Sequence, residues 1–507
     1  MATPSQPNPN AVQQLIQLLN NGQLAQAEAL AKNLTAQYPN TFILHHILAL
    51  ALDGQAKFDE AATSYKKAIK LQPNTPDLHF NLGIALANLN LLDEAEASYW
   101  QAIRLNPNFF EAHGNLGTIL QRQGKLDAAI ASYQTGLKIN PQDARGYFNL
   151  GTALRDQGRL DEAVASYKKA IEIFPNYVDA HCNLGETIRD QGNMEEAIKN
   201  YQNALAINPN HPQANYDMAE FLYLAHRYNE AIPHFETSQL DDWLARSMYC
   251  LYKAERFDEF KSKLDEVVKT TTHTAPFIAT LSSHYAINFD IENAYNFCKS
   301  GFDFVHKNAI PELAEPNSPL LSELLYDIEN VSIETRAQAM VINGKQSAGN
   351  LFKRPETSFK KLGELVQREF INYKNKFAGA DCELIKSFPD ELEFTSSWYV
   401  RLRRGGYVDR HIHEIGWISG AVYLVMPTPN DIDGAFEYGT HGDNYPIKPP
   451  KTLDDFPYEH VLPNVGDIVL FPSSLFHRTI PFNSNEARIC IAFDLKPSVN
   501  NGAKSSY

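Results

Sequence analysis

Three histidines in the last third of the chain have the residue types and the spacing of a metal site. His411 and His413 lie two residues apart, between Asp409 and Glu414, and His477 follows in a later apolar segment. Residues two apart in an extended chain point to one face, so the first two imidazoles are expected to point together. Imidazole nitrogens bind iron, copper, zinc and nickel. The pattern predicts a transition-metal site with His411, His413 and His477 as candidate ligands.

An arginine follows the last histidine at a spacing that suits a hairpin. A turn centred near Asn483 separates His477 from the segment 488–494. Folding about that turn is expected to place His477 beside Arg488 or Cys490 in the strand ladder, with residues 488, 490 and 492 on one face. Two or three imidazoles and a guanidinium on one sheet face resemble a non-haem Fe(II) site that takes an acidic cosubstrate.

The segments that carry these residues have the pattern of β-strands. Tyr, Val, Ile, Trp and Phe recur in them at period two, and Gly, Pro and Asn turns separate them. This turn inventory favours an antiparallel sandwich or jelly roll over βαβ units. The chain contains no GxGxxG, P-loop or GxSxG motif. The predicted strands include residues 398–402, 421–425, 467–471 and 488–493.

One long helix is predicted to cover this sheet. Six apolar residues step by three or four positions after a cap at Thr357-Ser358, which lays one stripe along a helix. The stripe is expected to pack on Ile489, Ile491 and Phe493. The preceding residues, 307–356, are irregular and contain four prolines, so a domain boundary is predicted there. The stripe consists of Phe359, Leu362, Val366, Phe370, Tyr373 and Phe377.

The first half of the chain is an internal repeat. Prolines recur every 34 residues, at Pro39, Pro73, Pro107, Pro141, Pro175 and Pro209. Within the same frame an Asn-Leu-Gly triplet recurs early in each unit, and an Ala-x-x-x-Tyr pair recurs later, as in Ala129 and Tyr133. Glycines such as Gly124 mark the turn between two helices. Each unit is therefore predicted to be a helix pair.

This pattern resembles the tetratricopeptide repeat, over about residues 5–242 and some seven units. At the position three residues before the Leu of each triplet, these repeats resemble those of the O-linked GlcNAc transferase more than the generic consensus. The resemblance implies a solenoid whose concave face binds a peptide or a protein segment. The asparagines of these triplets would form a row on this face and bind an extended peptide backbone. Alternatively, Asn is the consensus residue at this position and serves the neighbouring helix. The row is Asn81, Asn115, Asn149 and Asn183.

The last third resembles the 2-oxoglutarate and Fe(II)-dependent oxygenase superfamily, over about residues 320–497. The resemblance rests on the histidine pair, on Gly466-Asp-Ile-Val-Leu-Phe-Pro-Ser-Ser, on His477 and on Arg488. It implies that His411 and His477 bind Fe(II) and that Arg488 binds the far carboxylate of 2-oxoglutarate. With O₂, the cosubstrate would be decarboxylated to succinate and CO₂ while a C–H bond is hydroxylated, and ascorbate could stimulate turnover.

Two positions differ from that family's pattern. Most members have Asp at the position of His413, so this imidazole is either a third ligand or a partner of the ligands, and the metal would have three histidines, or two and water. The residue two positions after Arg488 is often a hydroxyl in the family, whereas here it is Cys490, a weaker donor that is still predicted to contact the cosubstrate.

Composition limits the other classes of function. The 507 residues carry 45 Lys plus Arg against 60 Asp plus Glu, a net charge of −15, which disfavours nucleic-acid binding. There is no apolar run of membrane-spanning length and no signal-peptide pattern, so no membrane association and a cytoplasmic location are expected. The five cysteines are widely spaced and are expected to be reduced thiols.

The sequence therefore predicts a multidomain α plus β protein in four parts. These are a tetratricopeptide solenoid at 1–242, degenerate helical repeats at 243–306, an oxygenase-like jelly roll with supporting helices at 307–497, and a flexible tail at 498–507. The predicted activity is hydroxylation of a protein or peptide recruited by the repeats. The alternatives are a non-catalytic scaffold with a degenerate jelly roll, or a small-molecule hydroxylase. No catalytic residue beyond the metal site is expected.

Overall fold

The chain forms two compact units, Met1–Met218 and Ala219–Tyr507. The computed structural model describes residues 6–497 apart from 241, 331, 332, 334, 337–339, 389–391, 415, 429, 430, 443 and 444. The tail predicted at 498–507 lies outside the described residues. No helix of the described part of the chain is both long and apolar enough to span a bilayer.

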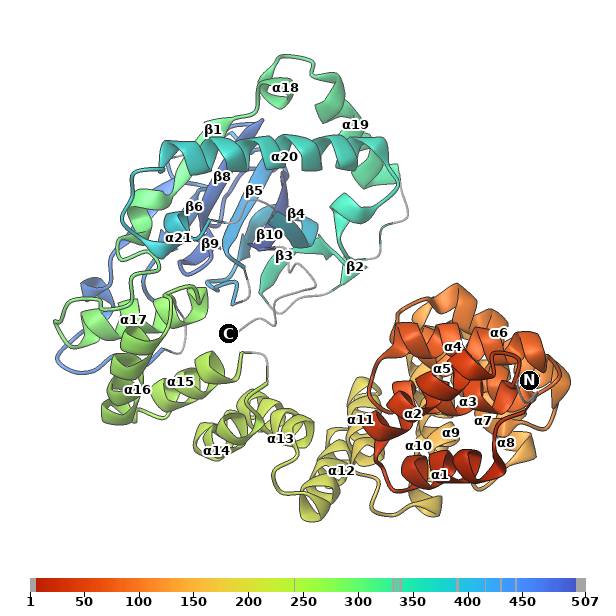
Figure 1. Ribbon diagram of the computed structural model, residues 1–507. Helices are drawn as coiled ribbons and strands as arrows, with labels where there is room; N and C mark the ends of the chain where they lie inside the picture. The colour runs from red at the N-terminus through yellow and green to blue at the C-terminus, as the bar shows by residue number, and fades with distance from the viewer. Residues whose placement is uncertain are drawn as a thin grey trace. The chain divides into compact units, whose positions relative to one another are not determined.

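The first unit consists of paired antiparallel helices, which confirms the predicted solenoid (Figure 1). In each pair the second helix ends before the repeated proline, because proline lacks an N–H and clashes with the preceding turn. Its helices are α1 (Pro9–Asn20), α2 (Leu24–Gln37), α3 (Phe42–Asp53), α4 (Phe58–Leu71), α5 (Pro76–Asn88), α6 (Leu92–Leu105), α7 (Phe110–Arg122), α8 (Leu126–Ile139), α9 (Ala144–Asp156), α10 (Leu160–Ile173), α11 (Val178–Asp190), α12 (Met194–Ile207) and the start of α13 (Pro212–Leu224).

The glycine of each Asn-Leu-Gly triplet is required by close helix packing. A Cβ on Gly117 would lie 2.6 Å from the ring of Tyr133, and one on Gly151 would lie 2.7 Å from the ring of Tyr167. Both tyrosines are buried. The turn glycines have a different role, since Gly124 has φ 75° and needs a left-handed conformation. The repeated glycines and tyrosines are therefore explained by the packing of the two helices in each pair.

A second repeated contact joins each first helix to the preceding turn. The imidazole of His79 donates to the carbonyl of Pro73 at 2.9 Å, and His113 and His181 make the same contact with Pro107 and Pro175 at 3.3 and 3.1 Å. These carbonyls accept only, so the imidazoles are the donors. The repeated prolines therefore end one helix and also anchor the next.

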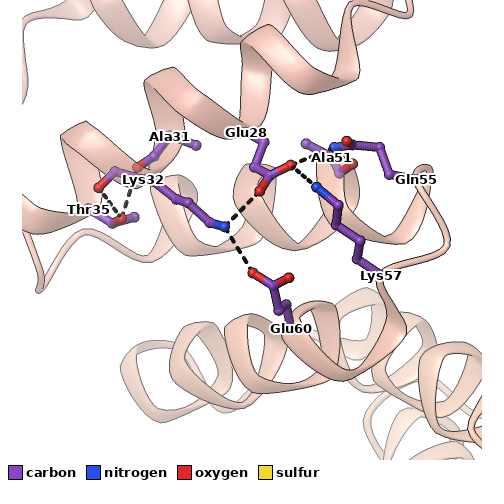
Figure 2. A network of polar contacts seen from close by, with 8 residues as sticks. All are labelled: Glu28, Ala31, Lys32, Thr35, Ala51, Gln55, Lys57 and Glu60. Carbon is purple, nitrogen blue, oxygen red and sulfur yellow. Dashed lines mark hydrogen bonds and ion pairs between the residues drawn. The ribbon is translucent and has the colours of Figure 1, made fainter.

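The first helix pairs are also joined by a network of charges around Glu28 (Figure 2). Its carboxylate accepts from Lys32 at 2.6 Å, from Lys57 at 2.7 Å and from Gln55 at 2.9 Å. Lys32 also reaches Glu60 at 2.9 Å, which links α2 to α4. The two lysines hold the pKa of Glu28 at about 2. The network is a structural connection between neighbouring repeats.

The second unit begins earlier than the predicted end of the regular repeats at 242. Its helical part comprises the end of α13, α14 (Tyr228–Ser238), α15 (Trp243–Lys253), α16 (Phe257–Thr270) and α17 (Pro276–Asn288). These helices bond to the β-domain: Thr280 donates to the carbonyl of Ser474 at 2.8 Å, and His284 pairs with His441 at 2.8 Å. Residues 219–306 therefore form one body with the β-domain.

Two antiparallel sheets make up the β-domain, and the predicted jelly roll is confirmed. In the described residues the orders are β1-β8-β5-β10-β4-β3-β2 and β7-β6-β9. Apolar residues of both sheets form one core, as in the contact of Phe436 with Phe471 at 4.8 Å between ring centres. The strands are β1 (His306–Ala309), β2 (Thr335–Arg336), β3 (Val341–Ser347), β4 (Leu392–Val408), β5 (Ile418–Val425), β6 (Phe436–Gly439), β7 (Tyr458–Val461), β8 (Asp467–Pro472), β9 (Phe476–Thr479) and β10 (Arg488–Pro497).

Helix α20 (Thr357–Lys376) lies across the larger sheet, as the stripe predicted (Figure 1). Phe359, Leu362, Val366, Phe370 and Tyr373 are buried, and Phe370 meets Phe493 of β10 edge to face. The capping prediction is wrong, because the helix begins after Glu356, while Ser358 donates to Asp327 instead. The shorter helices are α18 (Pro311–Ala314), α19 (Pro319–Asn330) and α21 (Glu383–Lys386). Because α20 covers one face of β10, residues 488, 490, 492 and 494 on the opposite face are left to line a cavity.

Candidate metal centre

The three predicted histidines meet in one cluster. A ring nitrogen of each lies within 4.8 Å of those of the other two. His411 Nε2 and His413 Nε2 are 3.1 Å apart, and His477 is 4.2 Å from His411 between ring centres. His411 follows β4 and His477 lies on β9, and their backbones exchange hydrogen bonds of 3.0 and 2.9 Å. A bridge between the two sheets therefore positions the cluster.

Acceptors behind each ring decide which nitrogen faces the cluster. His411 Nδ1 donates to the Asp409 carbonyl at 2.7 Å, and His477 Nδ1 donates to the Leu475 carbonyl at 3.2 Å. His413 Nδ1 bonds to Asp494 Oδ1. Because the first two acceptors are carbonyls, the Nε2 atoms of His411 and His477 carry lone pairs. Burial lowers the pKa of His411 to about 4 and that of His477 well below its usual value, which keeps both neutral.

This arrangement fits a divalent transition metal. Two unprotonated nitrogens 3.1 Å apart repel each other unless a cation lies between them, and neutral imidazole is a ligand for such ions. A backbone carbonyl or carboxylate behind each ring is also the usual support of metal-binding histidine. The donor set thus has the tautomers, the spacing and the burial that metal binding requires.

Asp494 is a part of the site that the sequence did not single out. It lies on β10 directly opposite Ser396 of β4 and Ser419 of β5. Ser419 Oγ donates to Oδ1 at 2.7 Å, and Ser396 Oγ donates to Oδ2 at 3.0 Å. Burial alone would raise the pKa of Asp494, but His413 and the two hydroxyls hold it below its ordinary value. The alternation of side chains along a strand could have identified Asp494, because residues 488, 490, 492 and 494 share a face.

Arg488 is buried against the same cavity. Its side chain is among the largest fully buried in the described residues, and the residue is only 2% exposed. Nε donates to the Gly434 carbonyl at 3.1 Å, Nη1 reaches Cys490 Sγ at 3.6 Å, and the guanidinium lies 5.0 Å from the centre of the Tyr423 ring. No carboxylate of the described chain pairs with it in the structure. A buried cation with this environment is suited to an acidic ligand.

The predicted hairpin between His477 and Arg488 is wrong. Strand β9 pairs with β6 in the small sheet, whereas β10 pairs with β4 and β5 in the large sheet. The residues between β9 and β10 cross from one sheet to the other. Such a crossing is common in jelly rolls, whereas the predicted hairpin would keep both strands in one sheet. His477 and Arg488 nevertheless line one cavity, because the inner faces of the two sheets point at each other.

That cavity has a volume of about 780 Å³ and is lined by the three histidines, Arg488, Cys490 and Asp494. Its apolar wall includes Trp398, which stacks on His413 with 5.7 Å between ring centres, and Val400. Its polar lining brings the histidine cluster, Arg488 and Asp494 into one space. The cavity is large enough for a metal together with a small organic acid.

Two carboxylates near the histidine cluster, Glu437 and Glu414, are tied into the structure. Glu437 on β6 is buried between Arg410, at 2.6 Å, and Arg478, at 2.6 and 3.0 Å. These arginines hold the pKa of Glu437 below its ordinary value against the effect of burial. Glu414 follows His413 and accepts from the hydroxyl of Tyr223 at 3.2 Å. Both carboxylates therefore brace the chain beside a histidine of the cluster.

Comparisons with protein families agree with this geometry. A family model described as "Putative 2OG-Fe(II) oxygenase" matches residues 396–494, which span the three histidines, Arg488 and Asp494. Tetratricopeptide-repeat models match 55–90, 76–109, 98–131, 115–178, 166–199 and 188–242. The chain is a tetratricopeptide-repeat protein with a 2-oxoglutarate/Fe(II) oxygenase domain. The family of that oxygenase domain implies Fe(II) and 2-oxoglutarate.

The solved structures that resemble this chain match only part of it. MamA is 27% identical, and the match covers 32% of this chain and 95% of that one with a TM-score of 0.31. YrrB, described as "a TPR protein with an unusual peptide-binding site", is 24% identical over 36% and 95%, with a TM-score of 0.32. PilF of Pseudomonas aeruginosa is 21% identical over 38% and 90%, with a TM-score of 0.35. No curated protein matches the chain.

The asparagine row lies on the first helices of the repeats, as predicted. Asn81, Asn115, Asn149 and Asn183 belong to α5, α7, α9 and α11, and all four are half-buried. Asn115 and Asn183 also interact with the hydroxyls of Tyr99 and Tyr167 in the preceding repeats. The amides therefore serve the neighbouring helix while part of each side chain stays accessible. Their binding to a peptide stays a prediction.

His441, in the loop after β6, makes a structural contact. It is buried and bonds to His284 of α17, which in turn bonds to Tyr252 of α15 at 2.6 Å. The contact joins the helical part of the second unit to the loop after β6. Neither His441 nor His460 belongs to the metal cluster, which among the described residues comprises only His411, His413 and His477.

Proposed function

We propose that the chain is an Fe(II)- and 2-oxoglutarate-dependent dioxygenase that hydroxylates a protein or peptide segment recruited by the repeats. The observation that carries the proposal is the shared cavity, in which three histidines and an unpaired buried arginine face the same space. A metal alone would explain the histidines. The arginine additionally calls for an acidic cosubstrate beside the metal, and the oxygenase family match names that pair.

Each residue of the cavity has a definite part in this reaction. His411, His413 and His477 would hold Fe(II) through Nε2 and leave coordination positions open. Arg488 would bind the far carboxylate of 2-oxoglutarate, and Cys490 would keep the guanidinium in place through its sulfur. Val400, Trp398 and Tyr423 would shield the site from water. When bound, Fe(II) supplies the site at which O₂ oxidises cosubstrate and substrate, giving succinate, CO₂ and a hydroxylated product.

A polypeptide substrate is favoured by the repeats. Tetratricopeptide solenoids present an extended surface for chain segments, and the asparagine row would contact a peptide backbone there. A metabolite substrate would need no such surface. The residue that is hydroxylated would have to enter the cavity, whose volume accommodates one side chain beside the cosubstrate.

The test is an aerobic assay of the full-length chain with Fe(II), 2-oxoglutarate and ascorbate as the reductant that keeps iron Fe(II). Succinate release should rise when a proteolysed lysate is added, and peptides that gain one oxygen should be found by mass spectrometry. His477→Ala serves as the control that lacks a ligand. If metabolites but not peptides stimulate turnover, the substrate assignment is wrong. If purified protein binds no Fe(II), the non-catalytic scaffold is the correct function.

A further inference from the structure

The histidine cluster contains no carboxylate ligand, yet a carboxylate lies directly behind one of its rings. Asp494 Oδ1 accepts the Nδ1 proton of His413. That contact comes from β10, whereas His413 lies after β4, so two distant parts of the chain meet there. An ionised carboxylate only accepts, so the contact places the His413 proton on Nδ1 and leaves the Nε2 lone pair toward His411 and His477.

The residues around Asp494 hold its carboxylate in place. Its neighbours across both adjacent strands are serines, and each donates a hydroxyl to one carboxylate oxygen. Ser419 is held in turn by Ser473, the residue that follows β8, at 2.7 Å. The backbone carbonyl of Asp494 accepts from Thr395. Two serine hydroxyls on the carboxylate, supported by a third on Ser419, exceed what the sheet itself requires, because an apolar residue would pack at this position without any of them.

We propose that Asp494 is a positioning residue that acts through His413: it orients the imidazole for metal binding and supplies the negative charge that the ring lacks. The proposal rests on the proposed function, since it assumes that the cluster holds a divalent metal. It explains how a three-histidine site is compatible with an oxygenase domain. Most members of the family have a carboxylate at position 413, where it binds the metal directly. Here the carboxylate is Asp494 on β10, which acts on the metal through the imidazole of His413.

A purely structural role for Asp494 makes a different prediction. If the acid only satisfied the serines, its replacement would weaken the fold and would affect metal binding no more than any other buried acid of the sheet does. Asp467 on β8 provides that comparison. It is also a buried strand carboxylate, it accepts from the Asn464 backbone at 2.8 Å, and it does not line the cavity. Asp467→Asn is therefore the matched control for Asp494→Asn.

The experiment is an anaerobic titration of the full-length chain with Co(II), followed by its visible ligand-field bands, and with Mn(II), followed by electron paramagnetic resonance. Neither readout depends on turnover. Asp494→Asn is expected to lower metal affinity by about 10–100-fold, the usual cost of losing such a partner. Asp467→Asn should leave it within about 3-fold of the parent. Near-equal affinities in Asp494→Asn and the parent would overturn the proposal.

A double-mutant cycle with His413→Ala locates the effect. If Asp494 acts through the ring, adding Asp494→Asn to His413→Ala should cost almost nothing further, whereas independent roles would give additive losses and contradict the proposal. Circular dichroism checks that each variant folds. Should Asp494→Asn not fold, Ser419→Ala replaces it. This variant removes the hydroxyl that shares Oδ1 with His413, so it should lower metal affinity several-fold in the parent but not in His413→Ala. Absence of metal binding by the parent would refute the proposed function instead.

Discussion

His411 and His477 exchange both of their backbone hydrogen bonds, at 3.0 and 2.9 Å, although one follows a strand of the large sheet and the other lies in the small sheet. This bridge fixes the distance between the two backbones, independently of the contacts that their side chains make. The metal centre is therefore located at a junction between the sheets, where the backbone itself is preorganised. The predictions below test the roles assigned to residues at this junction and in the repeats.

Arg488→Ala should weaken 2-oxoglutarate binding far more than metal binding. It removes a charge-assisted contact worth about 1.5–3 kcal/mol, which corresponds to roughly 10–150-fold in affinity. The measurement is anaerobic titration of the Mn(II)-loaded protein with 2-oxoglutarate. Arg403→Ala, at an exposed position of β4, is the control. An unchanged cosubstrate affinity in Arg488→Ala would place the anchor elsewhere.

His413→Ala should lose metal affinity on the scale of a missing ligand. His413→Asp restores the pattern usual in the family, but it also places a second carboxylate beside Asp494, so it should retain metal poorly by itself. Combining His413→Asp with Asp494→Asn removes this repulsion and should bind metal better than His413→Asp alone. Co(II) titration of the three variants compares them. Equal affinity of the parent and His413→Ala would show that His413 is no ligand.

The pair Asn115→Ala and Asn149→Ala should weaken capture of peptides while the helical content stays unchanged. Both side chains are half-buried on first helices, and losing such amides costs the fold little. Peptides from a proteolysed lysate, recovered on the immobilised full-length chain and identified by mass spectrometry, provide the measurement. Asn108→Ala, in an exposed turn between repeats, is the control. The same peptide set from mutant and parent would support the consensus explanation of the row.

Two glycines of α7 should respond in opposite directions to alanine. At Gly117 a Cβ would lie 2.6 Å from Tyr133, whereas at Gly114 nothing lies within 4 Å. Gly117→Ala is expected to destabilise the array by about 1–3 kcal/mol through overpacking. Gly114→Ala should stabilise it by about 0.5–1 kcal/mol, because alanine loses less entropy in a helix. Urea midpoints of the helical circular-dichroism signal compare them, and a similar shift in both would contradict the packing account.

The Glu28 network should stabilise the first repeats in a pH-dependent way. The pKa of Glu28 is about 2 in the folded chain and ordinarily 4.5, so its contribution is complete above about pH 4.5 and is lost as the pH falls toward 2. Glu28→Gln should therefore lower the urea midpoint at pH 7, and the difference from the parent should shrink at pH 3. Glu94→Gln, which removes an exposed ion pair with Lys66, should change little at either pH.

The sequence by itself determined the repeats, most strands and the three histidines that are the candidate metal ligands. The 34-residue period is legible because each helix pair packs by the same local contacts, such as glycine against tyrosine and histidine against a proline carbonyl. Period two placed His411 with His413 and aligned 488, 490 and 492 on one face, because alternation in a strand is a local property. The apolar stripe of α20 could be predicted for the same reason, because the helical period is also a local property.

Only the tertiary structure decided how these elements meet. The crossing between sheets separates β9 from β10 and brings His477 to Arg488 across the cavity instead of along a ladder. Asp494 joined the site because β4, β5 and the segment after β4 bring Ser396, Ser419 and His413 to it, and no spacing along the chain encodes that meeting. Local periodicity reports which way a side chain points. Which partner it finds depends on contacts between residues far apart in the chain, and these form only when the sheets pack.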